Sequence, residues 1–139
     1  MSTILANVSC VAVAGRAILI EGDPGSGKTS LALALIDRGA MLIGDDGATL
    51  TLDGERLLAS PPPNIAGLVE VRNVGLVRLE TTCAPLSLVV RLDPAAPRHV
   101  ETAEGVERAG RTVPFIALDP AGAILPLRAE YALERHGLG

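Results

Sequence analysis

One stretch of the chain decides the predicted fold: Gly22-Asp23-Pro24-Gly25-Ser26-Gly27-Lys28-Thr29. It matches the phosphate-binding loop pattern Gly-x-x-x-x-Gly-Lys-[Ser/Thr] at every position. Its glycines allow backbone conformations that turn successive N–H groups toward phosphate oxygens, and a following helix adds its partial positive charge. We expect Lys28 to reach the β- and γ-phosphates and the Thr29 hydroxyl to join a Mg²⁺ shell. Ser30, the next residue, is included in the predicted nucleotide-binding set.

The segments on either side suit this loop. Residues 16–20 are a short apolar run, which is typical of a buried strand, and residues 8–14 predict a strand that precedes it through a tight turn at Ala14-Gly15. Residues 30–38 have apolar side chains four apart, which predicts a helix that ends at Gly39. Strand, loop and helix agree, so a chance glycine-rich turn is the weaker interpretation.

Two adjacent carboxylates follow the next apolar run. Residues 41–43 predict a buried strand that leads to Asp45 and Asp46. In phosphate-loop proteins an acidic residue at a neighbouring strand end completes the Mg²⁺ site. The second carboxylate can then accept the proton of the hydroxyl that receives the phosphoryl group. The alternative is that Asp-Asp-Gly only forms a turn, leading into a hairpin predicted around Asp53-Gly54.

The rest of the chain has weaker signals. Glu70 and Arg72 project from one face if their segment is extended, which suggests a further metal ligand and a cation near phosphate, or an exposed ion pair. Residues 86–92 and 112–118 predict strands. Residues 127–136 predict a helix with Leu127 and Tyr131 on one side and Gly137 as its stop. The pattern of residues 95–111 predicts no regular element.

Composition excludes several function classes. The chain has 139 residues, which predicts one domain, and a net charge of −4. Lys28 is its only lysine, and Phe115 and Tyr131 are its only aromatic residues, so neither a basic stripe nor a stacking platform for nucleic acid is expected. Cys10 and Cys83 are expected to be reduced thiols. No signal peptide and no membrane span is predicted, so we expect a cytoplasmic protein.

The order of these parts resembles the catalytic domain of the HPr kinase/phosphorylase family. It has a hairpin, the loop motif, a helix ending in Arg-Gly, a strand ending in Asp-Asp, and then Glu-Val-Arg-Asn-Val-Gly at residues 70–75. The resemblance spans residues 7–77 and continues more weakly to Pro120. It implies an α/β fold: a phosphate-loop kinase core of the HPr kinase/phosphoenolpyruvate carboxykinase type, with a mixed β-sheet and few helices. Residues 1–139 would form a single catalytic domain that lacks the amino-terminal regulatory domain of longer members.

The resemblance also implies an activity. The family uses ATP, or pyrophosphate, with Mg²⁺ to phosphorylate a serine of HPr, the small phosphocarrier protein of the bacterial sugar phosphotransferase system, and its members are often homo-oligomers. Carried over by position, the catalytic set is Asp45, Asp46 and Arg72, with Asp46 as the general base. The metal set is Thr29, Asp45 and Glu70.

Several positions depart from the family pattern. Asn7 stands where the family usually has a histidine near the catalytic aspartate, and an asparagine cannot tune Asp46 through protonation. Asn73 replaces a glycine of the family segment. Residues 118–121, Leu-Asp-Pro-Ala, are not basic where long members have Arg-Pro-Gly-Arg. These departures argue against the phosphate-driven reverse reaction.

The residues leave two alternatives to a protein kinase. Asn7 and the missing basic stretch also fit a non-catalytic sensor of nucleotide or phosphate. The third hypothesis is that the same core phosphorylates a small molecule.

Overall fold

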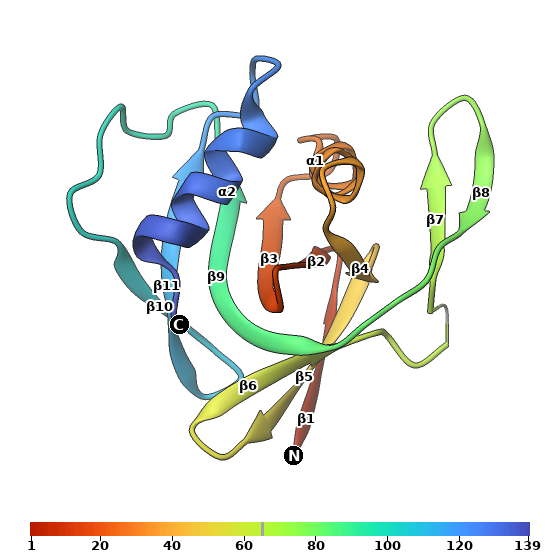
Figure 1. Cartoon of the computed structure of the whole chain (residues 1–139), viewed down its shortest axis with the longest axis horizontal. Helices are drawn as coiled ribbons and strands as arrows, with labels where there is room; N and C mark the ends of the chain where they lie inside the picture. Colours follow the sequence, from red (N-terminus) through yellow and green to blue (C-terminus); the bar gives the residue numbers. More distant parts are fainter. Residues whose placement is uncertain (65) are drawn as a thin grey trace.

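The computed structural model describes residues 1–64 and 66–139 (Figure 1). Its elements follow in this order along the chain: β1 (Ser2–Ala6), β2 (Ser9–Val13), β3 (Arg16–Gly22), α1 (Lys28–Asp37), β4 (Met41–Gly44), β5 (Gly47–Asp53), β6 (Arg56–Ser60), β7 (Leu68–Val71), β8 (Gly75–Arg78), β9 (Ala84–Leu92), β10 (Glu104–Arg108), β11 (Arg111–Leu118) and α2 (Leu125–His136). The described chain therefore has a mixed α/β fold with few helices, as the family resemblance implied.

The strand, loop and helix around the glycine-rich motif form as predicted. β2 and β3 are antiparallel, and Ala14 (φ 50°) and Gly15 (φ 81°) make the turn between them. Helix α1 begins at Lys28, two residues earlier than predicted, and Gly39 (φ 111°) follows its last residues. Arg38 is the C-cap residue of α1 and pairs with Glu130 of α2 at 2.9 Å. The predicted turn at Ala14-Gly15 and the predicted end of the helix at Gly39 are thus confirmed.

Strand β9 joins the two halves of a curled sheet. The order along the main path is β1-β5-β6-β9-β3-β2-β4, and β11 adds to β9 and carries β10. β9 starts antiparallel to β6 and continues parallel to both β3 and β11. Figure 1 shows it curving around the interior of the molecule. Because Leu92 pairs with both Gly22 and Leu118, the carboxyl ends of the three parallel strands meet at one sheet edge.

Aliphatic side chains fill two cores on opposite faces of this sheet. One lies under the helices and includes Ile18, Leu35, Leu88 and Leu133. The other lies inside the curl and includes Cys10, Leu19, Leu50, Leu86 and Val89. Alternate residues of β3 and β9 supply the two cores, because successive side chains of a strand point to opposite faces. Both helices cover the same face (Figure 1).

The structure corrects several expectations about the weaker segments. Strand β1, which pairs with β5, was not predicted, and β10 lies within the stretch expected to be irregular. The hairpin turn between β5 and β6 is Gly54-Glu55, one residue later than predicted, because Asp53 pairs with Arg56. Helix α2 starts at Leu125 and buries Ala129 and Leu133, whereas Tyr131 is exposed.

The segment from residue 67 to residue 78 forms a hairpin of its own. β7 and β8 pair with each other in a separate two-stranded sheet. Figure 1 shows this hairpin standing apart from the curled sheet, beyond α1. Val74 in its turn and Leu76 in β8 are largely exposed, whereas Val69 in β7 is buried.

No helix within residues 1–64 and 66–139 is long and apolar enough to cross a membrane.

Candidate functional site

The loop between β3 and α1 adopts its turns through glycine. Gly25 (φ 79°) and Gly27 (φ 105°) have left-handed backbone conformations, and Gly27 is the N-cap of α1. At Gly22 a β-carbon would clash with the Oγ of Ser26. Ser26 donates its N–H to the carbonyl oxygen of Asp23 at 3.0 Å, which closes the loop on itself. The glycines at positions 22, 25 and 27 therefore have a steric or conformational role in this loop.

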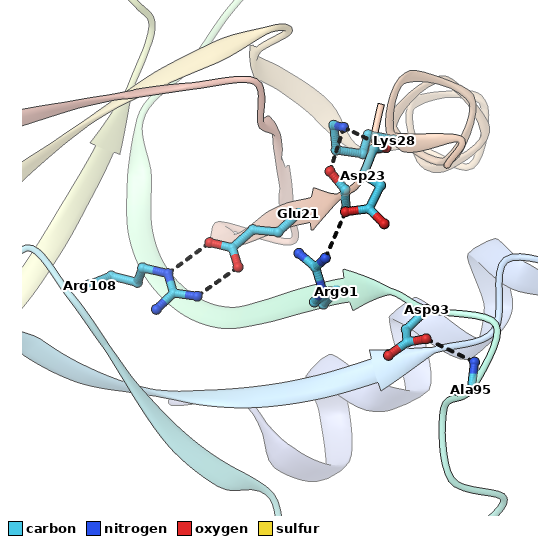
Figure 2. Close-up of polar contacts among 8 residues, drawn as sticks. Glu21, Asp23, Lys28, Arg91, Asp93, Ala95 and Arg108 are labelled. Carbon is cyan, nitrogen blue, oxygen red and sulfur yellow. Dashed lines mark hydrogen bonds and ion pairs between the residues drawn. The ribbon is translucent and has the colours of Figure 1, made fainter. Parts of the chain in front are cut away.

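Lys28 lies over the loop. Its Nζ donates to the carbonyl oxygens of Gly22 at 2.8 Å and of Asp23 at 3.2 Å (Figure 2). The ammonium group and the N-terminus of α1 thus bring positive charge to the same place. The Oγ of Ser26 is buried and has no hydrogen-bond partner among the described residues. An anion entering the loop would offer that hydroxyl an acceptor.

Asp45 joins the loop to strand β2. Its Oδ1 accepts a hydrogen bond from Thr29 Oγ1 at 2.8 Å and another from Ser9 Oγ at 3.0 Å, and the residue is 9% exposed. At Gly44, just before it, a β-carbon would clash with the carbonyl oxygen of Gly47. The tight turn that this glycine allows returns the chain into β5 and sets Asp45 beside Thr29.

Asp46 is the exposed member of the carboxylate pair. It has a left-handed backbone conformation (φ 59°), and so does Asn7 (φ 61°), which donates its N–H to the carbonyl oxygen of Asp46 at 3.2 Å. The two carboxylates therefore face different surroundings, one buried and one open to solvent. The predicted proximity of Asn7 and Asp46 is confirmed.

Two charge pairs next to the loop were not predicted from the sequence. Arg108 makes a two-pronged contact with Glu21, from Nε to Oε2 at 2.7 Å and from NH2 to Oε1 at 2.7 Å. Arg91 NH2 contacts Asp23 Oδ1 at 3.1 Å. Figure 2 shows both pairs at the carboxyl ends of β3 and β9. Their only sequence signal was the position of Glu21 and Arg91 at the ends of apolar runs.

The Glu21–Arg108 pair is the more firmly held of the two. The hydrogen bonds to Glu21 raise the pKa of Arg108, against an opposing effect of its partial burial. Its side chains are 28% and 15% exposed, whereas those of Arg91 and Asp23 are 40% and 85% exposed. A two-pronged, partly buried pair of this kind is stronger than a single exposed contact.

The structure does not bring Glu70 and Arg72 to the carboxylate pair. Glu70 lies in β7 and Arg72 in the turn that follows, and both are exposed. Among the described residues, neither side chain has a hydrogen bond or an ion pair with Asp45 or Asp46. Asn73 (φ 70°) and Gly75 (φ 125°) shape the same turn. Because Arg72 belongs to the turn, the two side chains do not share one face of a strand.

The two histidines lie away from the loop. His99 pairs with Glu101 at 2.9 Å between exposed side chains, and His136 ends α2, where Arg135 is also found. The residues 118–121 follow the end of β11, where Asp119 Oδ1 accepts the N–H of Ala121 at 3.0 Å. Among the described residues, neither histidine has a hydrogen bond or an ion pair with the 22–29 loop, and residues 118–121 include no basic side chain.

Comparison with known proteins places this geometry in a family. The family model of the HPr serine kinase C-terminal domain matches residues 2–91. The chain belongs to the HPr serine kinase C-terminal domain family. The solved structure of the HPr(Ser) kinase/phosphatase from Coxiella burnetii is similar in fold, with a TM-score of 0.83 and 23% sequence identity over 95% of this chain and 88% of that one. The resemblance predicted from the motif order is thus confirmed, and the structural match extends beyond residue 91.

The donor groups beside the loop suit the magnesium ion that this HPr kinase family fold implies. Thr29 and Asp45 offer a hydroxyl and a carboxylate oxygen, which are the hard ligands that Mg²⁺ prefers. Within residues 1–64 and 66–139, no group of three or more His, Cys, Asp or Glu side chains is arranged to hold a metal. A site in which the protein supplies only one carboxylate is still typical of Mg²⁺, because this ion takes its other ligands from water and substrate phosphates.

Proposed function

We propose that this chain is a Mg²⁺-dependent kinase that transfers a phosphoryl group from ATP, or from pyrophosphate, to a serine of HPr or an HPr-like phosphocarrier protein. The observation that carries the proposal is the pair of hydrogen bonds through which buried Asp45 joins Thr29 to Ser9, with exposed Asp46 next in the chain. One carboxylate is thereby available to a metal and the other to an acceptor. Membership of the HPr kinase family supports this class of acceptor.

Each residue has a distinct role in this proposal. Lys28 and the N–H groups of the 22–29 loop bind phosphate oxygens, and Thr29 and Asp45 hold Mg²⁺, which neutralises charge on the phosphates when it is bound. Asp46 takes the proton of the serine hydroxyl while the serine oxygen bonds to phosphorus and the leaving phosphate oxygen departs.

Glu70 and Arg72 enter the proposal conditionally. Their roles as a further metal ligand and a phosphate-facing cation require the β7–β8 hairpin to approach the loop, because neither side chain contacts the carboxylate pair. We further infer that the kinase works in the cytoplasm and that it is a homo-oligomer. Light scattering of the purified protein would test the oligomeric state.

The deciding experiment follows radiolabelled phosphate from ATP to HPr in the presence of Mg²⁺. We expect transfer by the wild type and a loss of about 100-fold or more in Asp46→Asn, because the amide cannot accept the proton. Asp53→Asn is the matched control: it changes an exposed aspartate at the far end of β5 and should transfer at the wild-type rate. A wild type that neither binds nucleotide nor transfers phosphate would overturn the proposal.

A second function has one observation in its favour. Asn7, which is hydrogen-bonded to the backbone of Asp46, cannot carry a charge. This favours a non-catalytic sensor that binds nucleotide or phosphate and regulates a partner. Tight binding of Mg²⁺ and ATP without turnover would identify the sensor, and turnover gained by Asn7→His would identify a decayed kinase.

A further inference from the structure

Arg91 has an unusual pairing for its position in the sheet. In the parallel register of β3 and β9, Arg91 is the partner of Glu21, so the two side chains leave the same face of the sheet side by side. Opposite charges so placed are expected to pair with each other. They do not, because Arg108 already occupies both carboxylate oxygens of Glu21, each at 2.7 Å.

Arg91 turns to the loop instead. Its guanidinium makes one contact, at 3.1 Å, with the carboxylate of Asp23, the second residue of the 22–29 loop. Figure 2 shows the Glu21 side chain directed toward Arg108 and the Arg91 guanidinium directed toward Asp23. A single contact between side chains that are 40% and 85% exposed stabilises the fold little, so Arg91 can exchange this partner for another.

A polyphosphate in the loop would compete with Asp23 for this cation. Asp23 belongs to the loop that, in the proposed function, holds the polyphosphate. A polyphosphate carries more negative charge than one carboxylate, and the planar fork of arginine matches the geometry of phosphate oxygens. Arg108 has no comparable freedom because both of its forked contacts are already made.

We propose that Arg91 is a phosphate-binding residue of this site, which exchanges the carboxylate of Asp23 for an oxygen of a polyphosphate bound in the 22–29 loop. The proposal rests on the proposed function in one respect only, that polyphosphate binds the loop. It adds to the loop a cation from β9 at a sheet edge where residues 118–121 supply none.

The rival role for Arg91 is to neutralise Asp23 without touching the ligand. A double-mutant cycle separates the two roles. If Arg91 only cancels the charge of Asp23, its removal has no effect once Asp23 is uncharged. If Arg91 binds phosphate, its removal weakens binding whether or not Asp23 carries a charge.

The experiment measures, by calorimetry, the binding of ATP with Mg²⁺ and of pyrophosphate with Mg²⁺ to wild type, Arg91→Gln, Asp23→Asn and the double variant. We expect Arg91→Gln to weaken both ligands about 10-fold in both backgrounds, which is typical of losing a charge-assisted hydrogen bond. Equal losses for ATP and pyrophosphate indicate a phosphate contact, because pyrophosphate has no base or sugar. A double variant that binds as tightly as Asp23→Asn overturns the proposal.

Arg38→Gln is the matched control. Arg38 also makes an exposed ion pair, at 2.9 Å with Glu130, and its side chain is 42% exposed. This pair joins the two helices and not the loop. Arg38→Gln should leave both affinities unchanged. Arg91→Lys serves as a second variant if Arg91→Gln does not fold, and it should also weaken binding because lysine lacks the fork.

Failure of this proposal is distinguishable from failure of the proposed function. A wild type that binds polyphosphate but transfers nothing to HPr overturns the kinase and leaves Arg91 as a phosphate-binding residue. A wild type that binds neither ATP nor pyrophosphate overturns both.

Discussion

At the scale of single residues, the decisive side chain is Asp45, because one of its oxygens serves two elements. Ser9 and Thr29 both donate to Oδ1, so the carboxylate joins β2 to α1. An asparagine retains one side-chain oxygen and can accept both hydrogen bonds, whereas an alanine leaves both hydroxyls without an acceptor.

We therefore expect Asp45→Ala to lower the free energy of unfolding by about 1–3 kcal/mol, the usual result of leaving a buried polar group unpaired. Asp45→Asn should retain most of the wild-type value. Urea denaturation of the three proteins measures the difference. Equal destabilisation by Ala and Asn would contradict this assignment of the hydrogen bonds.

The two cysteines differ in burial, and their chemistry should differ accordingly. Burial raises the pKa of the Cys10 thiol to about 12, whereas Cys83 is exposed. At pH 8 an alkylating reagent should modify Cys83 alone in the native protein and both thiols in denaturant, because only the thiolate reacts. Mass spectrometry counts the modified sites. Modification of Cys10 in the native protein would show that β2 opens readily.

Cys10 also predicts a loss of stability in alkali. In the folded protein the Cys10 thiol has a pKa of about 12, against 9.0 for the free thiol. Between these two pH values, therefore, only the unfolded chain releases the thiol proton. The stabilising contribution is complete below pH 9 and is lost as the pH rises toward 12. Cys10→Ala should remove this part of the pH dependence, which denaturation between pH 8 and pH 11 would reveal.

At the scale of elements, β7 and β8 differ from every other strand pair in the described chain. They bond only to each other, and an isolated two-stranded hairpin is marginally stable in water. By contrast, β3 and β9 lie inside the curled sheet, with buried side chains on both faces.

We expect the amide hydrogens of β7 and β8 to exchange with solvent much faster than those of β3 and β9 in the same protein. Hydrogen exchange followed by mass spectrometry or NMR measures both, with β3 and β9 as the internal reference. Equal protection would contradict the expectation that this hairpin is only marginally stable. Fast exchange would agree with a hairpin that can approach the loop with Glu70 and Arg72.

At the scale of the whole molecule, stability depends on aliphatic packing on both faces of one sheet. Leu88 is fully buried under the helices, whereas Leu76 is 71% exposed on the hairpin. Leu88→Ala should cost about 2–5 kcal/mol of unfolding free energy through the cavity that it leaves. Leu76→Ala should change it by less than about 0.5 kcal/mol. Chemical denaturation of both variants tests the contrast.

Prediction from the sequence succeeded where a local physical rule decides the structure. Gly25 and Gly27 take the left-handed conformations that only glycine adopts easily, apolar runs identified β3 and β9, and the four-residue spacing of apolar side chains identified α1. It failed where distant partners decide. Strand β1 exists because β5 offers it a ladder of hydrogen bonds, and Tyr131 is exposed because Ala129 and Leu133 face the core instead.

The sequence by itself determined the glycine-rich loop, the order of strands and helix around it, the Asp45-Asp46 pair and the family resemblance, because each depends on residues close together in the chain. Only the tertiary structure decided which carboxylate is buried against Thr29, that Glu70 and Arg72 stand apart on a hairpin, and that Arg91 turns to the loop. Each depends on contacts between segments far apart in the chain: β4 with α1, β7 with β8 away from the main sheet, and β9 with β3. A strand's partners are set by packing between distant segments, and a single sequence does not contain that information in local form.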